Sequence, residues 1–380
     1  MPTTILANRL ITANQIIQRP LLTLEDATIA AISSLEDSDA TTVTHHWPEA
    51  TITAGLFDVH THGAVGHDVM EGSADAFRNI GKFLALHGVT EYLATTVTAS
   101  MDFTKGALAA MARHMERGPE AEEARIAGIH IEGPFLSHAK RGMHPPNHLQ
   151  RPSPDILEQL WQASEGRIVL MTIAPELPGA IETIARAHEL GIRCSIGHSD
   201  ADTPQTVQAL KTGVASATHT FNAMRTLNQR DPGILGLVLD RDEIYSDLIC
   251  DGVHVAPELV RLWLKAKGPE RAILITDALE ATGMPNGVYK LGETRVHVQD
   301  GRCTTDEGVL AGSVLTLDQA VTNVRSFTNC DLTTAVRLAS SNPLQMLRWQ
   351  DRLRIGGVAN FNVFDPQGER VATVLRGKLL

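Results

Sequence analysis

The middle of the chain alternates short apolar runs with longer segments of helical periodicity. The helical patterns include SADAFRNIGKFLALHG and LPGAIETIARAHELG, and both end in glycine, a common C-terminal cap. Strands of a parallel sheet are buried on both faces, so they read as continuous apolar runs separated by helices. Eight such units over about 220 residues predict a (β/α)8 barrel. The runs are GLFDVH (55–60), TEYLATTVT (90–98), ARIAGIHIE (124–132), RIVLMTIAPE (167–176), GIRCSIGH (191–198), GVASATH (213–219), EIYSDLICD (243–251) and RAILITD (271–277).

The two ends of the chain show a different pattern, of short strands and turns. Residues 1–53 contain TTILANRLI and LLTLEDATIAAISSL, and the C-terminal NFNVFDPQGERVATVLRGKLL has the same character. Its tetrapeptide DPQG, at 365–368, favours a turn between two alternating runs. We therefore expect a small β-sandwich domain made of residues 1–53 plus 351–380, and a barrel over residues 54–350.

The composition narrows the classes of partner. The chain has 380 residues, of which 43% are hydrophobic, so it can bury a substantial core. Its formal net charge is −11, from 44 acidic and 33 basic residues. Nucleic acids and anionic membranes reward clustered lysine and arginine, so neither is an expected partner. A small anionic substrate stays compatible, because a few local donors outweigh net charge at close range.

Cysteine usage and the N-terminal segment predict a cytoplasmic protein. The cysteines are scattered and form no CxxC pair, which favours reduced thiols. The N-terminal MPTTILANRLITANQ has neither the basic region nor the long apolar region of a signal peptide. No apolar run approaches the ~20 residues that span a membrane. The four cysteines are Cys194, Cys250, Cys303 and Cys330.

Ionisable residues gather where the predicted strands end. In a (β/α)8 barrel the carboxyl ends of all strands open on one face, where active sites are built. Residues far apart in sequence are therefore expected to converge there. These residues are His60 and His62 on the first strand, Glu132 on the third, His198 on the fifth, His219 on the sixth, Asp251 and His254 on the seventh, and Asp277 on the eighth.

His60 and His62 in FDVHTHG are the most informative pair. Side chains two apart on a strand point the same way, so both imidazoles face the barrel mouth if the segment stays extended. Two neutral imidazoles on one side suit Zn²⁺ or Fe²⁺. An isolated HxH more often means a strand cap and a solvated side chain. Because carboxylate and imidazole groups also stand at the other strand ends, metal binding is the favoured interpretation here.

The other candidates each have a structural alternative. Glu132, in IHIEGPF, is costly after an apolar strand unless it pairs with an Arg or His or binds a metal. His198 and His219 follow small apolar residues, and each taken singly would be a hydrogen-bonded core histidine. Asp277, after ILIT, is the best candidate for a general base, and its alternative is an N-cap.

A series of short motifs occurs along nearly the whole chain. They are FDVHTHG, GIHIEGPFLS, KRGMHPP, IGHSDA, THTFNAM, DPGILG, CDGVHV, TDALEATG and LAGSVLTLDQAV, in this order. Together they resemble the amidohydrolase superfamily and, more narrowly, the N-acetylglucosamine-6-phosphate deacetylases, with N-acetylgalactosamine-6-phosphate deacetylases as close relatives. The resemblance implies a TIM-type barrel, hydrolysis of N-acetylglucosamine 6-phosphate to glucosamine 6-phosphate and acetate, and a homodimer.

The resemblance also implies a divalent metal cofactor, with one or two ions per subunit. Zinc is the expected ion, and iron, manganese and cobalt are alternatives. Glu132, His198 and His219 match metal ligands, while His60 and His62 match the ligands of a second ion. Many amidohydrolases bridge two ions with a carboxylated lysine on strand four, but IVLMTIAPE has no lysine. Glu132 would then be the bridge.

The residues that act on the substrate are implied in the same way. Asp277 matches a general base that later acts as acid, and His144 in RGMHPP matches a histidine that contacts the N-acetyl group. Backbone N–H donors and a guanidinium fork suit the oxygens of a phosphate. The implied substrate-binding residues are Asn222 and Ala223 of FNAM, Arg230, His254, and Arg261, the last toward a phosphate in a neighbouring subunit.

Three alternatives stay open. The substrate could be the galactosamine epimer, because no residue that reads the epimeric hydroxyl is identified. Another amidohydrolase reaction on a different amide would use the same metal ligands. A catalytically inactive homologue could serve as a scaffold or sugar sensor, although every expected ligand and the base are present.

The remaining histidines are predicted to lie outside the reaction centre. His130 shares a strand face with Glu132 and is expected to orient it. The proline-rich 137–155 loop is predicted to act as a lid over the barrel mouth. Four histidines in polar or helical settings are expected at the surface: His45, His46, His114 and His188.

Overall fold

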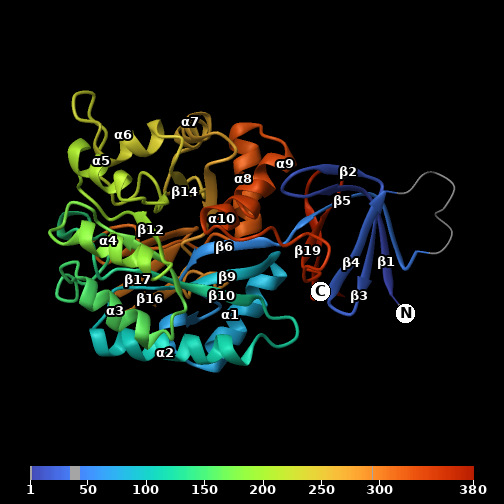
Figure 1. Cartoon of the computed structure of the whole chain (residues 1–380), viewed down its shortest axis with the longest axis horizontal. Helices are drawn as coiled ribbons and strands as arrows, with labels where there is room; N and C mark the ends of the chain where they lie inside the picture. The colour runs from blue at the N-terminus through green and yellow to red at the C-terminus, as the bar shows by residue number, and fades with distance from the viewer. Residues whose placement is uncertain (1, 35–42, 293) are drawn as a thin grey trace.

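A barrel of parallel strands forms the larger part of the molecule (Figure 1). The computed structural model describes residues 2–34, 43–292 and 294–380. The backbone N–H of Asp277 donates to the His60 carbonyl at 2.9 Å, so the last strand of the barrel also meets the first. The predicted (β/α)8 fold is confirmed. In chain order its neighbouring strands are β6 (Leu56–Thr61), β9 (Val89–Thr96), β10 (Arg125–Glu132), β11 (Ile168–Ile173), β12 (Arg193–Ile196), β13 (Ser216–Ala217), β14 (Tyr245–Ile249) and β15 (Ala272–Ile275).

Helices cover the outside of the barrel (Figure 1), and some of them begin at side-chain caps. Ser73 accepts the Ala76 N–H at 3.1 Å, and Asp202 forms a capping box with Gln205. No helix in the described part of the chain is long and apolar enough to cross a membrane. The helices are α1 (Ala74–Leu86), α2 (Met101–Arg117), α3 (Pro154–Ala163), α4 (Ala180–Glu189), α5 (Thr203–Lys211), α6 (Gly233–Asp240), α7 (Pro257–Lys267), α8 (Leu317–Thr328), α9 (Leu332–Leu338) and α10 (Ser341–Met346), with 3-10 turns η1 (Val69–Glu71) and η2 (His138–Lys140).

Strands from both ends of the chain join one separate sheet, as predicted. The strand β5 pairs with β1 on one side and with β19 on the other, so the N- and C-terminal segments are hydrogen-bonded directly. Leu10, Ile52 and Phe361 are fully buried in a core that belongs to this sheet. Its strands are β1 (Thr3–Ile11), β2 (Ile16–Gln18), β3 (Pro20–Glu25), β4 (Thr28–Ser34), β5 (His45–Ala54), β19 (Phe361–Phe364), β20 (Arg370–Leu375) and β21 (Lys378–Leu379).

This sheet lies at the amino ends of the barrel strands. The strand β5 ends at Ala54 and β6 begins at Leu56, so the chain passes directly from sheet to barrel. Asn362 Nδ2 donates to the Gly88 carbonyl at 2.9 Å, just before β9 begins. The carboxyl ends of the strands therefore face away from the sheet.

A small antiparallel sheet between β15 and α8 was not predicted. Its first hairpin joins β16 to β17, and the second turns at Asp300 and Gly301, which both have positive φ. The dipeptide DG is a common signal for such a hairpin turn. The strands are β16 (Gly287–Leu291), β17 (Thr294–Gln299) and β18 (Arg302–Thr305), and a two-stranded hairpin pairs β7 (Gly63–Ala64) with β8 (His67–Asp68).

The prediction that His114 lies at the surface is wrong. Its side chain is 8% exposed, and its ring packs against Phe77. Its Nε2 lies 2.6 Å from Oε1 of Glu123, which is fully buried. A carboxylate beyond the end of the helix supplies the partner that lets this histidine turn inward, and no helical periodicity signals such a pair.

Candidate metal centre and active site

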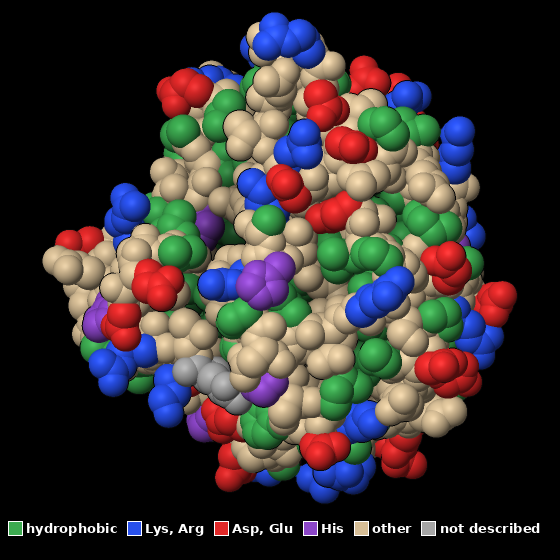
Figure 2. Space-filling model, turned by 90° about the vertical axis from the view of Figure 1, so that its left-hand side faces the viewer, with side chains coloured by type: hydrophobic (Ala, Val, Ile, Leu, Met, Phe, Trp, Pro, Cys, Tyr) green, Lys and Arg blue, Asp and Glu red, His purple; other side chains and the backbone are tan. Residues whose placement is uncertain are grey.

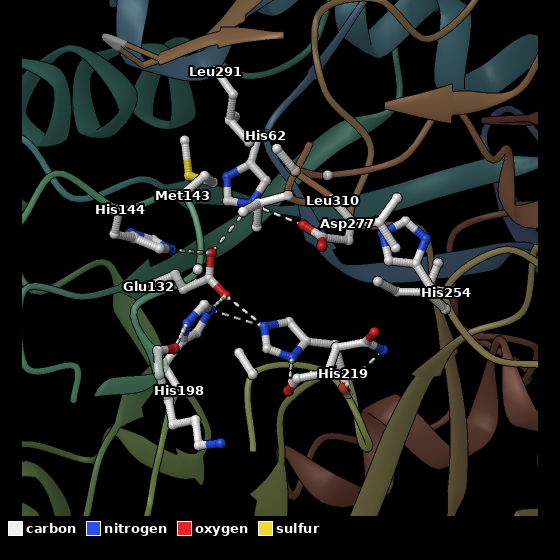
Figure 3. Close-up of a pocket in the computed structure, with 18 of the residues that line it drawn as sticks. His62, Glu132, Met143, His144, His198, His219, His254, Asp277, Leu291 and Leu310 are labelled. Atoms are coloured by element: carbon white, nitrogen blue, oxygen red, sulfur yellow. Dashed lines mark hydrogen bonds and ion pairs between the residues drawn. The ribbon is translucent and has the colours of Figure 1, made fainter. Parts of the chain in front are cut away.

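The predicted ligands converge around Glu132 at the carboxyl ends of the barrel strands (Figure 3). Glu132 is the last residue of β10, and 3% of its surface is exposed. His60 is in β6 and His62 follows its last residue, and their side chains lie on the same side, as the alternation of an extended chain requires. The other candidates follow the ends of their strands: His198 after β12, His219 after β13 and Asp277 after β15.

Three of these side chains turn inward through left-handed backbone conformations. The φ angles are 48° at His198, 35° at His219 and 52° at Asp277. This region costs a non-glycine residue about 1–3 kcal/mol, so the surrounding structure must enforce it. The carboxylate of Asp247 accepts the His219 backbone N–H and so helps to hold one of these turns.

His198 and His219 aim lone pairs at each other and at Glu132. Nδ1 of His198 donates to the Lys140 carbonyl at 2.8 Å, and Nδ1 of His219 donates to the Asn222 carbonyl at 3.2 Å. With the protons on Nδ1, both neutral rings present lone pairs at Nε2. Yet the two Nε2 atoms are 3.0 Å apart, and Glu132 Oε1 lies 3.3 Å and 3.2 Å from them. Such facing acceptors need a cation between them.

His60 and His62 repeat this arrangement on the other side of Glu132. Nδ1 of His62 donates to the Thr95 carbonyl at 3.0 Å, which again leaves a lone pair at Nε2. Nε2 of His62 lies 3.2 Å from His60 Nε2, 3.3 Å from Glu132 Oε2 and 3.1 Å from Asp277 Oδ1. A second group of acceptors therefore shares the carboxylate of the first.

The residues fit one or two divalent metal ions. Nitrogen and oxygen atoms that bind one ion at about 2.0–2.2 Å lie roughly 3.0–3.6 Å apart, which matches the separations within each group. Glu132 belongs to both groups, as a bridging carboxylate would. The first group is His60, His62, Glu132 and Asp277, and the second is Glu132, His198 and His219.

The charge balance of the cluster also favours bound cations. Burial alone would lower the pKa of His219, but Glu132 raises it to about 9. Burial opposes a charge on His62 as well, yet Asp277 and Glu132 raise its pKa well above the usual value. Burial would raise the pKa of Asp277, but His60 and His62 lower it to about 2. A metal ion can supply the positive charge that protons otherwise bring.

His144 is a neutral hydrogen-bond donor at the edge of this centre. Its Nδ1 accepts the Thr98 backbone N–H at 3.3 Å, so the proton of the neutral ring is on Nε2. That nitrogen lies 3.6 Å from Glu132 Oε2. Burial lowers the pKa of His144 to about 4. The ring can therefore donate into the cavity without carrying a charge.

A cavity of about 340 Å³ opens over the candidate metal centre. The predicted residues Asn222, Ala223 and His254 line it, and the 137–155 loop contributes Lys140 and His144. Leu291 and Leu310, from the unpredicted small sheet and the segment after it, form an apolar wall. Figure 2 looks at the side of the molecule away from the chain-end sheet and shows a hollow bordered by histidine and basic side chains.

Two predicted substrate residues do not line this cavity. Arg230 lies on an exposed loop, where its backbone N–H donates to Asn228 Oδ1 at 2.9 Å. Arg261 is on α7, and its guanidinium donates to the Phe327 carbonyl at 3.1 Å and to Glu258 Oε1 at 3.0 Å. The two arginines therefore stand apart from the candidate centre of this chain.

Residues that position the ligands were missed by the sequence analysis. Asp58 is fully buried and accepts the His60 N–H at 3.2 Å and the Thr276 hydroxyl at 2.6 Å. Asp247 holds the turn at His219, as described above. In the sequence, each of these two aspartates stands inside an apolar strand run, and this unusual position is the signal by which they could have been found. His130, predicted to orient Glu132, instead packs edge-on against the His60 ring, with centroids 4.8 Å apart.

A family model and known proteins match this chain over most of its length. The amidohydrolase family model matches residues 51–380. The chain belongs to the amidohydrolase family. An N-acetylglucosamine-6-phosphate deacetylase of Lysinibacillus sphaericus is 39% identical over 295 residues, which cover 77% of this chain and 76% of that protein. An N-acetylgalactosamine-6-phosphate deacetylase of Escherichia coli O157:H7 is 34% identical over 341 residues, with coverages of 90% and 88%.

The same likeness extends to solved structures. A mutant N-acetyl-D-glucosamine-6-phosphate deacetylase of Mycobacterium smegmatis, in complex with N-acetyl-D-glucosamine-6-phosphate, matches with a TM-score of 0.93 at 30% identity. The match covers 100% of this chain and 99% of that one. The resemblance to N-acetylglucosamine-6-phosphate deacetylases within the amidohydrolase family, predicted from the motifs, is confirmed.

Proposed function

We propose that the protein hydrolyses the N-acetyl group of N-acetylglucosamine 6-phosphate to give glucosamine 6-phosphate and acetate. The observation that carries this proposal is the convergence of two histidine pairs on Glu132, with Asp277 beside them at one cavity. The substrate named for the L. sphaericus and M. smegmatis proteins supports the choice of acetamido sugar.

Divalent metal is the cofactor, with zinc as the first choice. Imidazole and carboxylate ligands suit zinc, and also iron, manganese and cobalt. Glu132, His198 and His219 would hold one ion, and His60 and His62 would add ligands for a second. An ion held there supplies a Lewis acid and lowers the pKa of water to about 7.

Asp277 serves as the general base and then as the general acid. Its carboxylate, with a pKa of about 2, is ionised at neutral pH and can accept the proton of the attacking water. The same oxygen can return that proton to the amine that leaves. The carboxylate lines the cavity, so it reaches the substrate without a change of fold.

His144 stabilises the negative charge that develops on the acetamide oxygen. The Nε2–H of this neutral ring donates toward the cavity, and Thr98 fixes its orientation from behind. A donor that is already oriented stabilises an oxyanion without reorganisation during the reaction.

Polar groups at the cavity mouth bind the sugar phosphate. Asn222, Ala223 and His254 line the cavity, and Lys140 adds a cationic side chain. Asp251 Oδ2 accepts from His254 Nδ1 at 2.7 Å and so fixes the ring of that histidine. Arg230 and Arg261 would complete the site from a neighbouring subunit of a homodimer.

N-acetylgalactosamine 6-phosphate is the second candidate substrate, supported by the E. coli relative.

We also propose that the protein is cytoplasmic, because its four cysteines are free thiols, as expected in a reducing compartment.

Acetate release from a substrate panel tests the function. The panel contains both 6-phosphate epimers and the two unphosphorylated acetamido sugars, and metal content is measured on the same protein. We expect the highest kcat/KM with N-acetylglucosamine 6-phosphate, and a loss of at least about tenfold without the phosphate, because charge-assisted hydrogen bonds disappear. A metal-loaded protein that releases no acetate from any of the four would contradict the proposal.

A further inference from the structure

A second polar cleft opens at the end of the barrel opposite the metal centre. Its walls come from the segment before β12, the turn before β13 and the residues after α10. Arg193 lines this cleft and is the first residue of β12. His198 of the metal centre comes after the last residue of the same strand. The cleft has a volume of about 530 Å³, within the range of small-molecule sites. It is therefore a cavity separate from the one that holds the reaction.

Two guanidinium groups and an imidazole line this cleft without a carboxylate to balance them. Arg193, Arg348 and His188 contribute the polar side chains. Among the described residues that line the cleft, none is acidic. In a chain with a net charge of −11, such a local excess of positive charge is unusual. The cleft is thus complementary to an anion.

Most of the hydrogen-bonding capacity of these arginines is unused. The Arg193 Nε–H donates to the Met346 carbonyl at 3.0 Å. The guanidinium of Arg348 is exposed and makes no hydrogen bond or ion pair with a described residue. Burial and the neighbouring Arg348 hold the pKa of Arg193 below its usual range, so the two groups repel each other. An oxyanion between them would remove that repulsion.

His188 adds a third polar side chain with an unused nitrogen. Its Nε2 is buried and has no hydrogen-bond partner among the described residues. The ring packs against the turn at Gly213, where an added Cβ would lie 2.9 Å from His188 Cε1. Burial, with Arg193 and Arg348 nearby, lowers the pKa of His188. A buried polar nitrogen without a partner is rare, and a ligand in the cleft could provide one.

Another arginine-rich cleft of the molecule shows the contrasting arrangement. There Glu91, which is 5% exposed, pairs with Arg125 and accepts from Arg352 Nε at 2.8 Å. The carboxylate occupies the place between the guanidinium groups, so those arginines are satisfied within the fold. Arg193 and Arg348 lack such a residue, and an external anion is the group that fits.

We propose that the cleft formed by His188, Arg193 and Arg348 binds a phosphate dianion, either free or as the phosphate of a small metabolite. Planar guanidinium groups match phosphate oxygens with paired N–H donors. Trp349 lines the same cleft and stands beside the anion.

Trp349 provides a probe that separates this cleft from the metal centre. The protein is labelled with 5-fluorotryptophan, and a Trp349→Phe variant identifies the fluorine resonance of Trp349. Titration with inorganic phosphate is expected to shift that resonance saturably, whereas sodium chloride at equal ionic strength leaves it in place. Glucose 6-phosphate forms a second arm, and its tighter or weaker binding distinguishes a metabolite site from a site for free phosphate.

Two variants of Arg348 test the assignment. Arg348→Gln removes one guanidinium, and Arg348→Glu places a carboxylate beside Arg193. We expect the first to weaken phosphate binding by about tenfold or more and the second to abolish it, with acetate release unchanged in both. Arg354→Gln is the matched control, because Arg354 is an exposed arginine that lines the other cleft. A Trp349 resonance that does not respond to phosphate, or that responds equally in Arg348→Glu, would overturn the proposal.

Discussion

At the scale of single residues, Asp277 shows how the barrel prepares a reactive group. Its backbone has a φ of 52°, and its N–H donates to the His60 carbonyl where the last strand meets the first. Its Oδ1 lies 3.1 Å from His62 Nε2 and 3.4 Å from His60 Nε2. The left-handed backbone at Asp277 therefore helps to place Oδ1 beside the proposed metal ligands.

Asp277→Asn tests the proposed role of this carboxylate as a base. The amide keeps the shape and the hydrogen bonds of the backbone but cannot accept the proton of water. We expect kcat to fall by roughly 10²–10⁴-fold, the usual contribution of a general base. Metal content, measured by mass spectrometry, should stay near that of the unchanged protein, because the other ligands remain. Near-normal acetate release by this variant would exclude Asp277 as the base.

Replacing both His60 and His62 by alanine tests the two-ion arrangement. The group made by Glu132, His198 and His219 stays complete in this variant, so one ion should remain. We expect metal stoichiometry to fall by about one ion per chain wherever the unchanged protein holds two. His198→Ala is the matched comparison, since it removes a ligand from the other group. Complete loss of metal from the double variant would contradict independent occupancy of the two groups.

The convergence of the candidate ligands could be predicted because they stand at strand ends, where residue type and spacing carry the information. Asp58 and Asp247 could not, because their partners come from other strands. Asp58 accepts from Thr276, which lies 218 positions further along the chain. The predicted roles of Arg230 and Arg261 in binding the substrate stay predictions, because neither arginine lines the cavity of its own chain.

At the scale of elements, the turn after β10 connects the stability of the fold with the site. Gly133 follows Glu132 with a φ of 89°, and a Cβ there would clash with Thr98 Oγ1. That hydroxyl lies 2.9 Å from His144 Nδ1. One glycine therefore permits the close packing that positions both the central carboxylate and the neutral histidine.

Gly133→Ala should lower both stability and activity. The positive φ alone costs about 1–3 kcal/mol for a non-glycine residue, and the contact with Thr98 adds to this. We expect a Tm several degrees lower by calorimetry and a kcat reduced by about tenfold, as Thr98 and His144 move. Gly118→Ala is the control, because Gly118 has a φ of 78° but open space around its Cβ. Equal effects of the two variants would show that packing at Thr98 is unimportant.

The eight barrel strands could be predicted because apolar runs and helical periods alternate regularly. Their ends were less predictable: the run GVASATH contains a strand of two residues, Ser216–Ala217, since the backbone turns left-handed at His219. The sheet of β16, β17 and β18 was missed, although the dipeptide DG at 300–301 is a hairpin signal. The division of the chain at 53/54 and 350/351 stays a prediction.

At the scale of the whole molecule, α7 and the loop that carries Arg230 present apolar side chains to solvent. Leu259 and Leu262 are 40% and 51% exposed on α7, and Leu227 is 55% exposed on the loop that carries Arg230. The helices α6 and α7 pack together, and Leu227 lies close to Gly236 of α6, where it would meet an added Cβ. A second copy of the chain on this surface would bury the leucines and bring Arg230 toward a neighbouring cavity.

Leu262→Glu tests whether the active form is a dimer built on this surface. A carboxylate buried in an apolar interface is costly, so we expect sedimentation to give the mass of a single chain. If Arg230 of one subunit binds the phosphate in the other, KM for the phosphorylated substrate should rise by at least about tenfold. Turnover of the unphosphorylated sugar should change little, because the candidate metal ligands all lie within one chain.

Val371→Glu provides the matched control for the dimer. Val371 is 59% exposed on β20 of the chain-end sheet, away from α7, so the same new charge should alter neither mass nor KM. Arg230→Ala in the unchanged dimer should reproduce the rise in KM without dissociation. If Leu262→Glu dissociates the protein but leaves KM unchanged, the phosphate is bound within one subunit, and Lys140 and His254 are then the groups that must bind it.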